Sequence, residues 1–201
     1  MKRCLVVFLL LVTVAFVVSA GPIPVALLPS TFIDISSGYG VGVGAVSTGH
    51  QIFNFDAAVG QVLKLEVVVT EVLQGTLAQD DDSTLFLFDS SGTLLASNDD
   101  IDPGQILPSL IQGFLVPATG TYYAGVTTYP NEPTDSNGVP FFDPGGVISG
   151  WSDNGQSNIK FELQISATPV TSAIPEPGSF GLLGLGTLVL AGFRRWHSTV
   201  R

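Results

Sequence analysis

The sequence DDDSTLFLFDSSGTLLASNDDID, residues 80–102, decides the fold class. Residues 85–88 are apolar and rich in strand-forming types, and residues 89–92 are typical of a tight turn in which Gly92 takes a positive φ. Residues 93–97 then return as a second apolar run. The stretch therefore predicts a β-hairpin.

Aspartates flank both ends of this hairpin, and folding it brings the two groups together. Carboxylates that lie so close repel one another unless a cation sits among them, and calcium prefers oxygen ligands. We therefore predict a structural Ca²⁺ site; a solvated acidic turn at a sheet edge is the alternative. The predicted ligands are Asp80, Asp82, Asp99, Asp100 and Asp102.

Apolar segments separated by Gly, Pro, Asn and Asp recur along the chain, whereas long amphipathic helical periods are absent. The 201 residues leave room for one domain with a core once two terminal segments are set aside. These patterns predict an all-β protein. Further strands are expected at residues 52–55, 62–72, 107–116, 121–129 and 159–167. Their inward-facing positions include Leu63, Leu65, Val67, Val69, Ile159, Phe161, Leu163 and Ile165.

The domain is strongly acidic. Between residues 21 and 176, Lys64 and Lys160 stand against all 17 acidic residues, a net charge of −15. Such a surface repels nucleic acid and anionic lipid headgroups and suits cations, neutral polysaccharide or basic partners. The single cysteine, Cys4, lies near the N-terminus, so the mature protein would contain no disulfide.

Residues 1–20 have the pattern of a secretory signal peptide, expected as an N-terminal signal helix that signal peptidase removes. Lys2 and Arg3 precede an apolar run at residues 5–18, which is too short for an ordinary membrane span. An uncleaved anchor is the alternative. Residues 21–49 are predicted to be a flexible segment that leads into the domain, although Ile33 and Ile35 are candidates for a first strand.

Three sequence blocks resemble the bacterial pre-peptidase C-terminal domain. They read FNFDAAVGQVLKL, LFLFDSSGTLLASNDD and PATGTYYAGV, and the resemblance covers about residues 50–168. It implies a jelly-roll-like β-sandwich that is accessory to function, sometimes binds calcium and sometimes contacts a polymer. In that family an Asp-x-Asp pair often opens the hairpin strand; here Asp82 matches the first position and Thr84 replaces the second.

Residues 130–158 are predicted to be a long loop that carries three aromatic side chains. Loops of this length are usually functional or disordered. Phe141, Phe142 and Trp151 are therefore candidate ligand-contact residues that stack on sugar, with covering the open end of the sandwich as the alternative.

After a linker at residues 169–173, the tail at residues 174–201 resembles the PEP-CTERM sorting signal, which the membrane protease exosortase recognises. Its cleavage motif is Pro175, Glu176 and Pro177, its apolar segment is residues 180–193, and Arg194 and Arg195 follow. The apolar segment predicts a transmembrane helix that anchors the chain transiently in the inner membrane, with the arginines on the cytoplasmic side. A plain C-terminal anchor is the alternative.

We expect an exported, non-enzymatic protein at the cell surface or in the exopolysaccharide matrix. A catalytic constellation is lacking in the sequence, because the two histidines have no cysteine partner and no nucleophile motif is present. A calcium-stabilised module that binds exopolysaccharide or another surface polymer is the first hypothesis. A structural matrix or envelope protein without a discrete ligand is the second, and a secreted hydrolase is the third.

Overall fold

The computed structural model describes residues 23–74, 81–102 and 108–169. The chain divides into two compact units, Met1–Thr168 and Pro169–Arg201, and all but the last described residue belong to the first. The predicted signal helix, the sorting tail with its transmembrane helix, most of the linker and Asp80 lie outside the described residues. In the three described ranges, no helix has the length and apolar character needed to cross a membrane.

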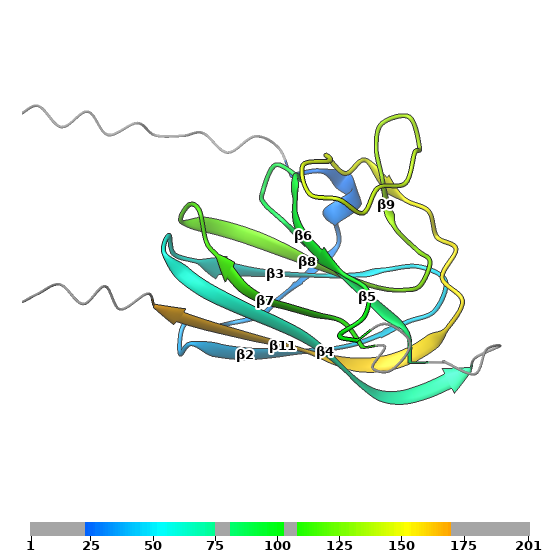
Figure 1. Cartoon of the computed structure of the whole chain (residues 1–201), viewed down its shortest axis with the longest axis horizontal. Coiled ribbons are helices and arrows are strands. Elements are labelled where there is room, and N and C mark those ends of the chain that lie inside the picture. Colours follow the sequence, from blue (N-terminus) through cyan, green and yellow to red (C-terminus); the bar gives the residue numbers. More distant parts are fainter. Residues whose placement is uncertain (1–22, 75–80, 103–107, 170–201) are drawn as a thin grey trace, which may run out of the picture. The chain divides into compact units, whose positions relative to one another are not determined.

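Two β-sheets form a sandwich, which confirms the predicted all-β class (Figure 1). One sheet has the strand order β1-β3-β8-β5-β6, the other has the order β2-β11-β4-β7, and β9 and β10 form a small separate pair. The jelly-roll arrangement implied by the resemblance stays a prediction. The elements are η1, a short 3₁₀ helix (Val25–Leu27), β1 (Ser30–Phe32), β2 (Tyr39–Val46), β3 (Gln51–Ala57), β4 (Gln61–Gln74), β5 (Ser83–Phe88), β6 (Leu94–Asn98), β7 (Leu110–Leu115), β8 (Gly120–Thr128), β9 (Pro133–Thr134), β10 (Gly150–Trp151) and β11 (Asn158–Pro169).

The predicted hairpin is present as the antiparallel pair β5 and β6. Leu85 lies opposite Asn98, and Gly92 takes a φ of 82° in the turn between the strands. On its other side β5 pairs antiparallel with β8. β5 is therefore held inside the five-stranded sheet with β6 at its edge, and this fixes where the aspartate-bearing ends of the hairpin lie.

Alternate side chains of both sheets meet in one apolar core between them. The inward-facing positions predicted for β4 and β11 are buried there, except that Val69 is only partly buried. Period-two burial thus follows the period-two alternation of the sequence.

A second apolar layer covers the outer face of the five-stranded sheet. Every residue of β5 is buried, because Leu85 and Leu87 face the main core while Phe86 and Phe88 face this outer layer. The cover consists of η1 and parts of the segment 130–158. That segment is therefore packed onto the sheet in part of its length.

Residues 30–46 contribute strands to both sheets, so the prediction that residues 21–49 form a flexible segment is wrong for this described part. β1 pairs parallel with β3, β2 pairs with β11 along its whole length, and Ile33 and Ile35 are buried in the core. The glycines of β2 alternate on its inward face, where a Cβ on Gly42 would lie 2.6 Å from side-chain atoms of Ile33 and Phe53. Glycine is thus required by the close approach of the two sheets.

Candidate metal centre and adjoining pocket

Three aspartates meet at one end of the β5–β6 hairpin. Asp82 precedes β5, whereas Asp99 and Asp100 follow β6, and one carboxylate oxygen from each lies within 4.8 Å of the others. All three side chains are partly buried. The structure therefore brings together three of the five predicted ligands. Asp102 is exposed and is not a member of this group.

Two neighbouring polar side chains bond to the Asp99 carboxylate and to the backbone of Asp100. The Thr84 hydroxyl donates a hydrogen bond of 2.7 Å to Asp99 Oδ1. Asn98 donates from Nδ2 to the Asp100 carbonyl oxygen at 3.1 Å and accepts the Leu110 backbone N–H at 2.6 Å. Thr84, which stands where the family pattern has a second aspartate, therefore orients a carboxylate.

Burial makes the ionised aspartates unfavourable in this position. Burial, followed by the charges of Asp99, Asp100 and Asp81, raises the pKa of Asp82 to about 7. Burial and then the Asp100 charge also raise the pKa of Asp99, against the opposing effect of the Thr84 hydrogen bond. The Oδ1 atoms of Asp82 and Asp100 are buried and have no hydrogen-bond partner among the described residues.

The chemistry of this group fits a hard cation. A cation among the three carboxylates would remove their mutual repulsion and satisfy the two buried oxygens. Calcium accepts six to eight oxygen ligands in adaptable geometry, so backbone carbonyls and water would complete the shell. Zinc does not fit, because neither cysteine nor histidine belongs to the group.

A pocket of about 240 Å³ adjoins the three aspartates and shares Asp99 with them. Burial, followed by the Asp99 charge, raises the pKa of the Glu132 carboxyl in this pocket. Glu132 and Tyr129 come from another part of the chain than the hairpin, and no sequence motif indicates that they lie beside Asp99. The lining residues are Thr84, Asp99, Tyr129, Pro130, Glu132 and Phe142.

The three candidate ligand-contact aromatics are partly buried in the outer apolar layer. The Trp151 ring stacks on His50 with centroids 4.7 Å apart and meets Phe86 edge-to-face at 5.7 Å. Phe142 also contacts Phe86 edge-to-face, at 5.8 Å, and it alone of the three lines the pocket. These rings pack onto the sheet, and their contact with a ligand stays a prediction.

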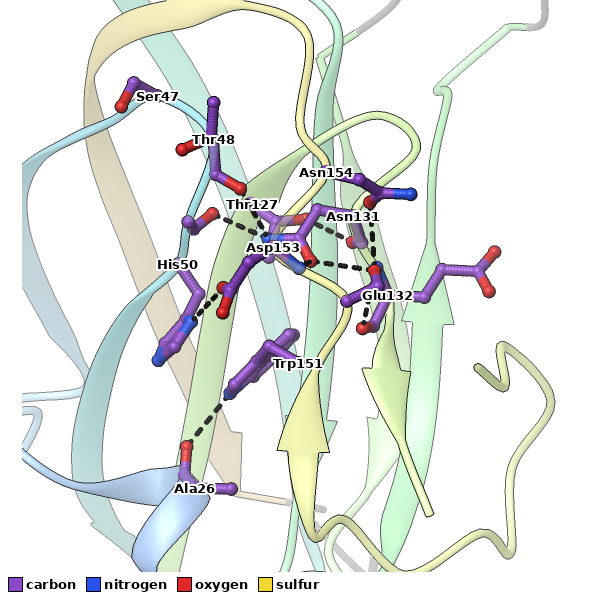
Figure 2. Close-up of polar contacts among 12 residues, drawn as sticks. Ala26, Ser47, Thr48, His50, Thr127, Asn131, Glu132, Trp151, Asp153 and Asn154 are labelled. Carbon is purple, nitrogen blue, oxygen red and sulfur yellow. Dashed lines mark hydrogen bonds and ion pairs between the residues drawn. The ribbon is translucent and has the colours of Figure 1, made fainter. Parts of the chain in front are cut away.

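Polar contacts fasten the segment around Trp151 to the rest of the sandwich (Figure 2). Trp151 Nε1 donates to the Ala26 carbonyl oxygen at 3.0 Å. The fully buried Asn131 donates to the Gly49 carbonyl oxygen at 2.7 Å and accepts the Asp153 backbone N–H at 2.9 Å. Residues distant in the sequence are thus tied together beside the pocket.

Comparison with known families identifies two parts of the chain. Residues 49–128 match the model of the bacterial pre-peptidase C-terminal domain, and residues 173–195 match the PEP-CTERM protein-sorting motif. The chain carries both. The matched part of the pre-peptidase C-terminal domain runs from the start of β3 to the end of β8 and contains all three grouped aspartates. The predicted sorting residues lie in or at the end of the second match.

Several solved structures are similar to the chain. A periplasmic inhibitor of g-type lysozyme, PliG of Aeromonas hydrophila, has 14% identity and a TM-score of 0.39 over 69% of this chain and 97% of its own. The pre-peptidase C-terminal domain of a Bacillus anthracis collagenase has 13% identity and a TM-score of 0.39, over 69% and 95%. CorA, a surface-associated copper-binding protein of Methylomicrobium album BG8, has 11% identity and a TM-score of 0.46, over 71% and 99%. At these TM-scores the likenesses carry no weight for function, and no curated protein matches the chain.

The packing of Trp151 predicts a structural effect of its removal. Trp151→Ala should lower the free energy of unfolding by about 2–4 kcal/mol, because a partly buried ring and its contacts with Phe86 are lost. Trp151→Phe keeps an aromatic ring but not the hydrogen bond to Ala26, so its free energy of unfolding should fall by about 1 kcal/mol. Chemical denaturation measures both values, and an unchanged stability of Trp151→Ala would show that the ring is free to serve a ligand.

The raised pKa of Asp82 predicts that the metal-free protein is less stable at higher pH. Its folded pKa of about 7 exceeds the unfolded value of about 3.8, so folding favours the protonated carboxyl. The resulting stability is fully present below the unfolded pKa and is lost as the pH rises through about 7. Melting temperatures in EDTA should therefore fall between pH 5 and pH 8.

Asp82→Asn is the matched control for this pH dependence, since the amide is nearly isosteric and stays neutral. It should be more stable than the natural protein at pH 8 and should remove the Asp82 contribution to the slope. His50 acts in the opposite direction, because burial lowers its pKa, and the control retains that effect. Equal slopes for the two proteins would contradict the assignment.

Proposed function

We propose that this protein is an exported accessory module that holds Ca²⁺ at Asp82, Asp99 and Asp100 and engages a surface polymer after sorting. The observation that carries the proposal is the combination of a pre-peptidase C-terminal domain with a PEP-CTERM motif. The motif implies export, processing by exosortase and sorting to the cell surface. This location and the acidic domain support a non-enzymatic role at the cell surface or in the exopolysaccharide matrix.

Calcium is supported by the electrostatics of the three aspartates. Two buried oxygens without hydrogen bonds and a carboxyl whose pKa is about 7 are unfavourable features that a divalent cation would offset together. A chain whose only cysteine is Cys4 gains no disulfide within the described domain, so an ion would add stability that its packing does not supply. The cation would then tie β5 to the segment after β6.

Melting curves in EDTA and in calcium test this site. An ion bound only to the folded state stabilises by about 2.7 kcal/mol at 100 times its dissociation constant. For a domain of this size the melting temperature should therefore rise by roughly 5–10 °C.

One double variant and one single variant distinguish a specific calcium site from general screening of the acidic surface. The combined change Asp99→Asn and Asp100→Asn should abolish the calcium response, whereas Asp102→Asn, outside the group, should retain it. Identical curves with and without calcium for the natural protein would leave only an acidic turn and would reject the metal site.

The pocket beside the aspartates supports binding of a polymer rather than a purely structural role. Its lining combines the aromatic rings of Tyr129 and Phe142 with the carboxylates of Asp99 and Glu132. Aromatic faces and hydrogen-bonding carboxylates are the groups with which proteins hold neutral sugar rings. The packing of Trp151 and Phe141 into the outer layer instead favours the second candidate, a matrix protein without a discrete ligand.

Intact-mass analysis tests the sorting step. In an exosortase-competent host, the protein should be severed near Pro175-Glu176-Pro177 and should lack residues 180–201. Glu176→Ala should leave the uncleaved precursor in the membrane, whereas Glu162→Ala on β11 should be processed normally. A mature species that retains the whole tail would overturn the proposed processing.

A further inference from the structure

Strand β2 lies at the edge of the four-stranded sheet (Figure 1). It pairs with β11 over all eight of its residues, and in the part of the chain that the structure describes no strand pairs with its other side. An edge strand of this length presents a row of backbone donors and acceptors that can pair with another chain.

The ladder shows which backbone groups face the open edge. The Ala167 N–H donates to the Gly38 carbonyl oxygen at 2.9 Å, so in antiparallel alternation the even-numbered residues of β2 bond to β11. The N–H and C=O groups of the odd-numbered residues point away from β11. These residues are Tyr39, Val41, Val43 and Ala45.

Side chains already satisfy two of these groups, one near each end of the strand. The Ser37 hydroxyl donates to the Tyr39 carbonyl oxygen at 3.1 Å, and the Gln51 Oε1 accepts the Ala45 N–H at 3.0 Å. The central groups, those of Val41 and Val43, have no such partner among the described residues. These unpaired N–H and C=O groups are available to hydrogen-bond with an added strand.

Features that usually block an edge are missing from β2. Its sequence YGVGVGAV has no charge and no proline, and its register with β11 runs without a bulge. The outward side chains of Tyr39, Val41 and Val43 are 49%, 41% and 73% exposed. A row of exposed apolar side chains thus accompanies the open backbone groups.

We propose that β2 pairs antiparallel with β2 of a second copy of this chain. A two-fold axis at Gly42 places Val41 opposite Val43 of the second copy, so the open N–H and C=O groups of the two residues exchange hydrogen bonds. The spacing of the open groups favours this occupant, because Val41 and Val43 lie symmetrically about Gly42 and their donors and acceptors therefore complement those of an identical strand. The net charge of −15 on residues 21–176 makes two copies repel each other, which weakens the contact, although the strand itself is uncharged. The product is one continuous eight-stranded sheet.

The contact is small, because each copy contributes one strand and three exposed side chains. Stable complexes bury about 800 Å² on each partner, and a single strand pair provides less. The dimer is therefore reversible and forms at high local concentration.

Sedimentation of the natural protein, purified from an exosortase-competent host over a range of concentrations, tests the proposal. It should convert reversibly from monomer to dimer. Hydrogen exchange at the Val41 and Val43 amides should slow as the dimer forms, because the paired strand protects them. A monomer up to the solubility limit, or a dimer in which these amides exchange as in the monomer, would overturn the proposal.

Matched variants show whether β2 is the contact. Val43→Pro removes an N–H that faces the open edge, which β11 does not use, and should raise the dissociation constant about tenfold or more, since two hydrogen bonds are lost per dimer. Val43→Lys should weaken dimerisation as well, and it replaces the proline variant if that variant folds poorly. Gln164→Lys is the control: it adds the same charge on β11 directly opposite Val41, one strand farther from the contact, and should dimerise normally. If the Val43 variants dimerise like the natural protein, or if Gln164→Lys impairs dimerisation as much as they do, the contact lies on another surface.

Discussion

Strand β5 is buried on both faces, and the position of the candidate metal centre depends on this. Leu85 and Leu87 enter the core between the sheets while Phe86 and Phe88 hold the outer apolar layer. A shift of one residue would exchange these faces, so both layers and both neighbouring strands oppose it. Asp82 and Asp99, at the ends of paired strands, are therefore placed by apolar packing.

This placement brings ionisable carboxylates close together in a partly buried position, and the described side chains do not neutralise them. Acidic groups that are partly buried close together are unfavourable when ionised, as the raised pKa of Asp82 and Asp99 shows. Thr84 relieves only one of them by donating a hydrogen bond to Asp99. A divalent cation bound there would offset this repulsion in a domain with so few basic residues, and its binding would then be linked to stability.

Much of the sandwich was predictable, because apolar and polar residues alternate wherever one strand face is buried. The hairpin and the inward faces of β4 and β11 followed directly from that rule. β2 was missed because its inward positions are glycines, as at Gly42, while Val41 and Val43 face outward. The apolar residues of its alternating pattern therefore lie on the exposed face. The inward positions are glycines because Ile33 and Phe53 approach the strand closely.

The site was predictable in part, for a similar reason. A hairpin dictates which of its own residues meet, so Asp82, Asp99 and Asp100 could be grouped from the sequence. Glu132 enters the same region from the segment after β8, and no local pattern encodes such a contact. The burial of Trp151 likewise depends on His50 and η1, which lie far away in the sequence.

A crystal structure of the calcium-soaked protein tests the metal centre most directly. The account predicts an anomalous density peak at about 2.3–2.6 Å from carboxylate oxygens of Asp82, Asp99 and Asp100, absent after soaking in EDTA. Water at that position, or calcium bound only elsewhere while the three carboxylates stay together, would contradict it.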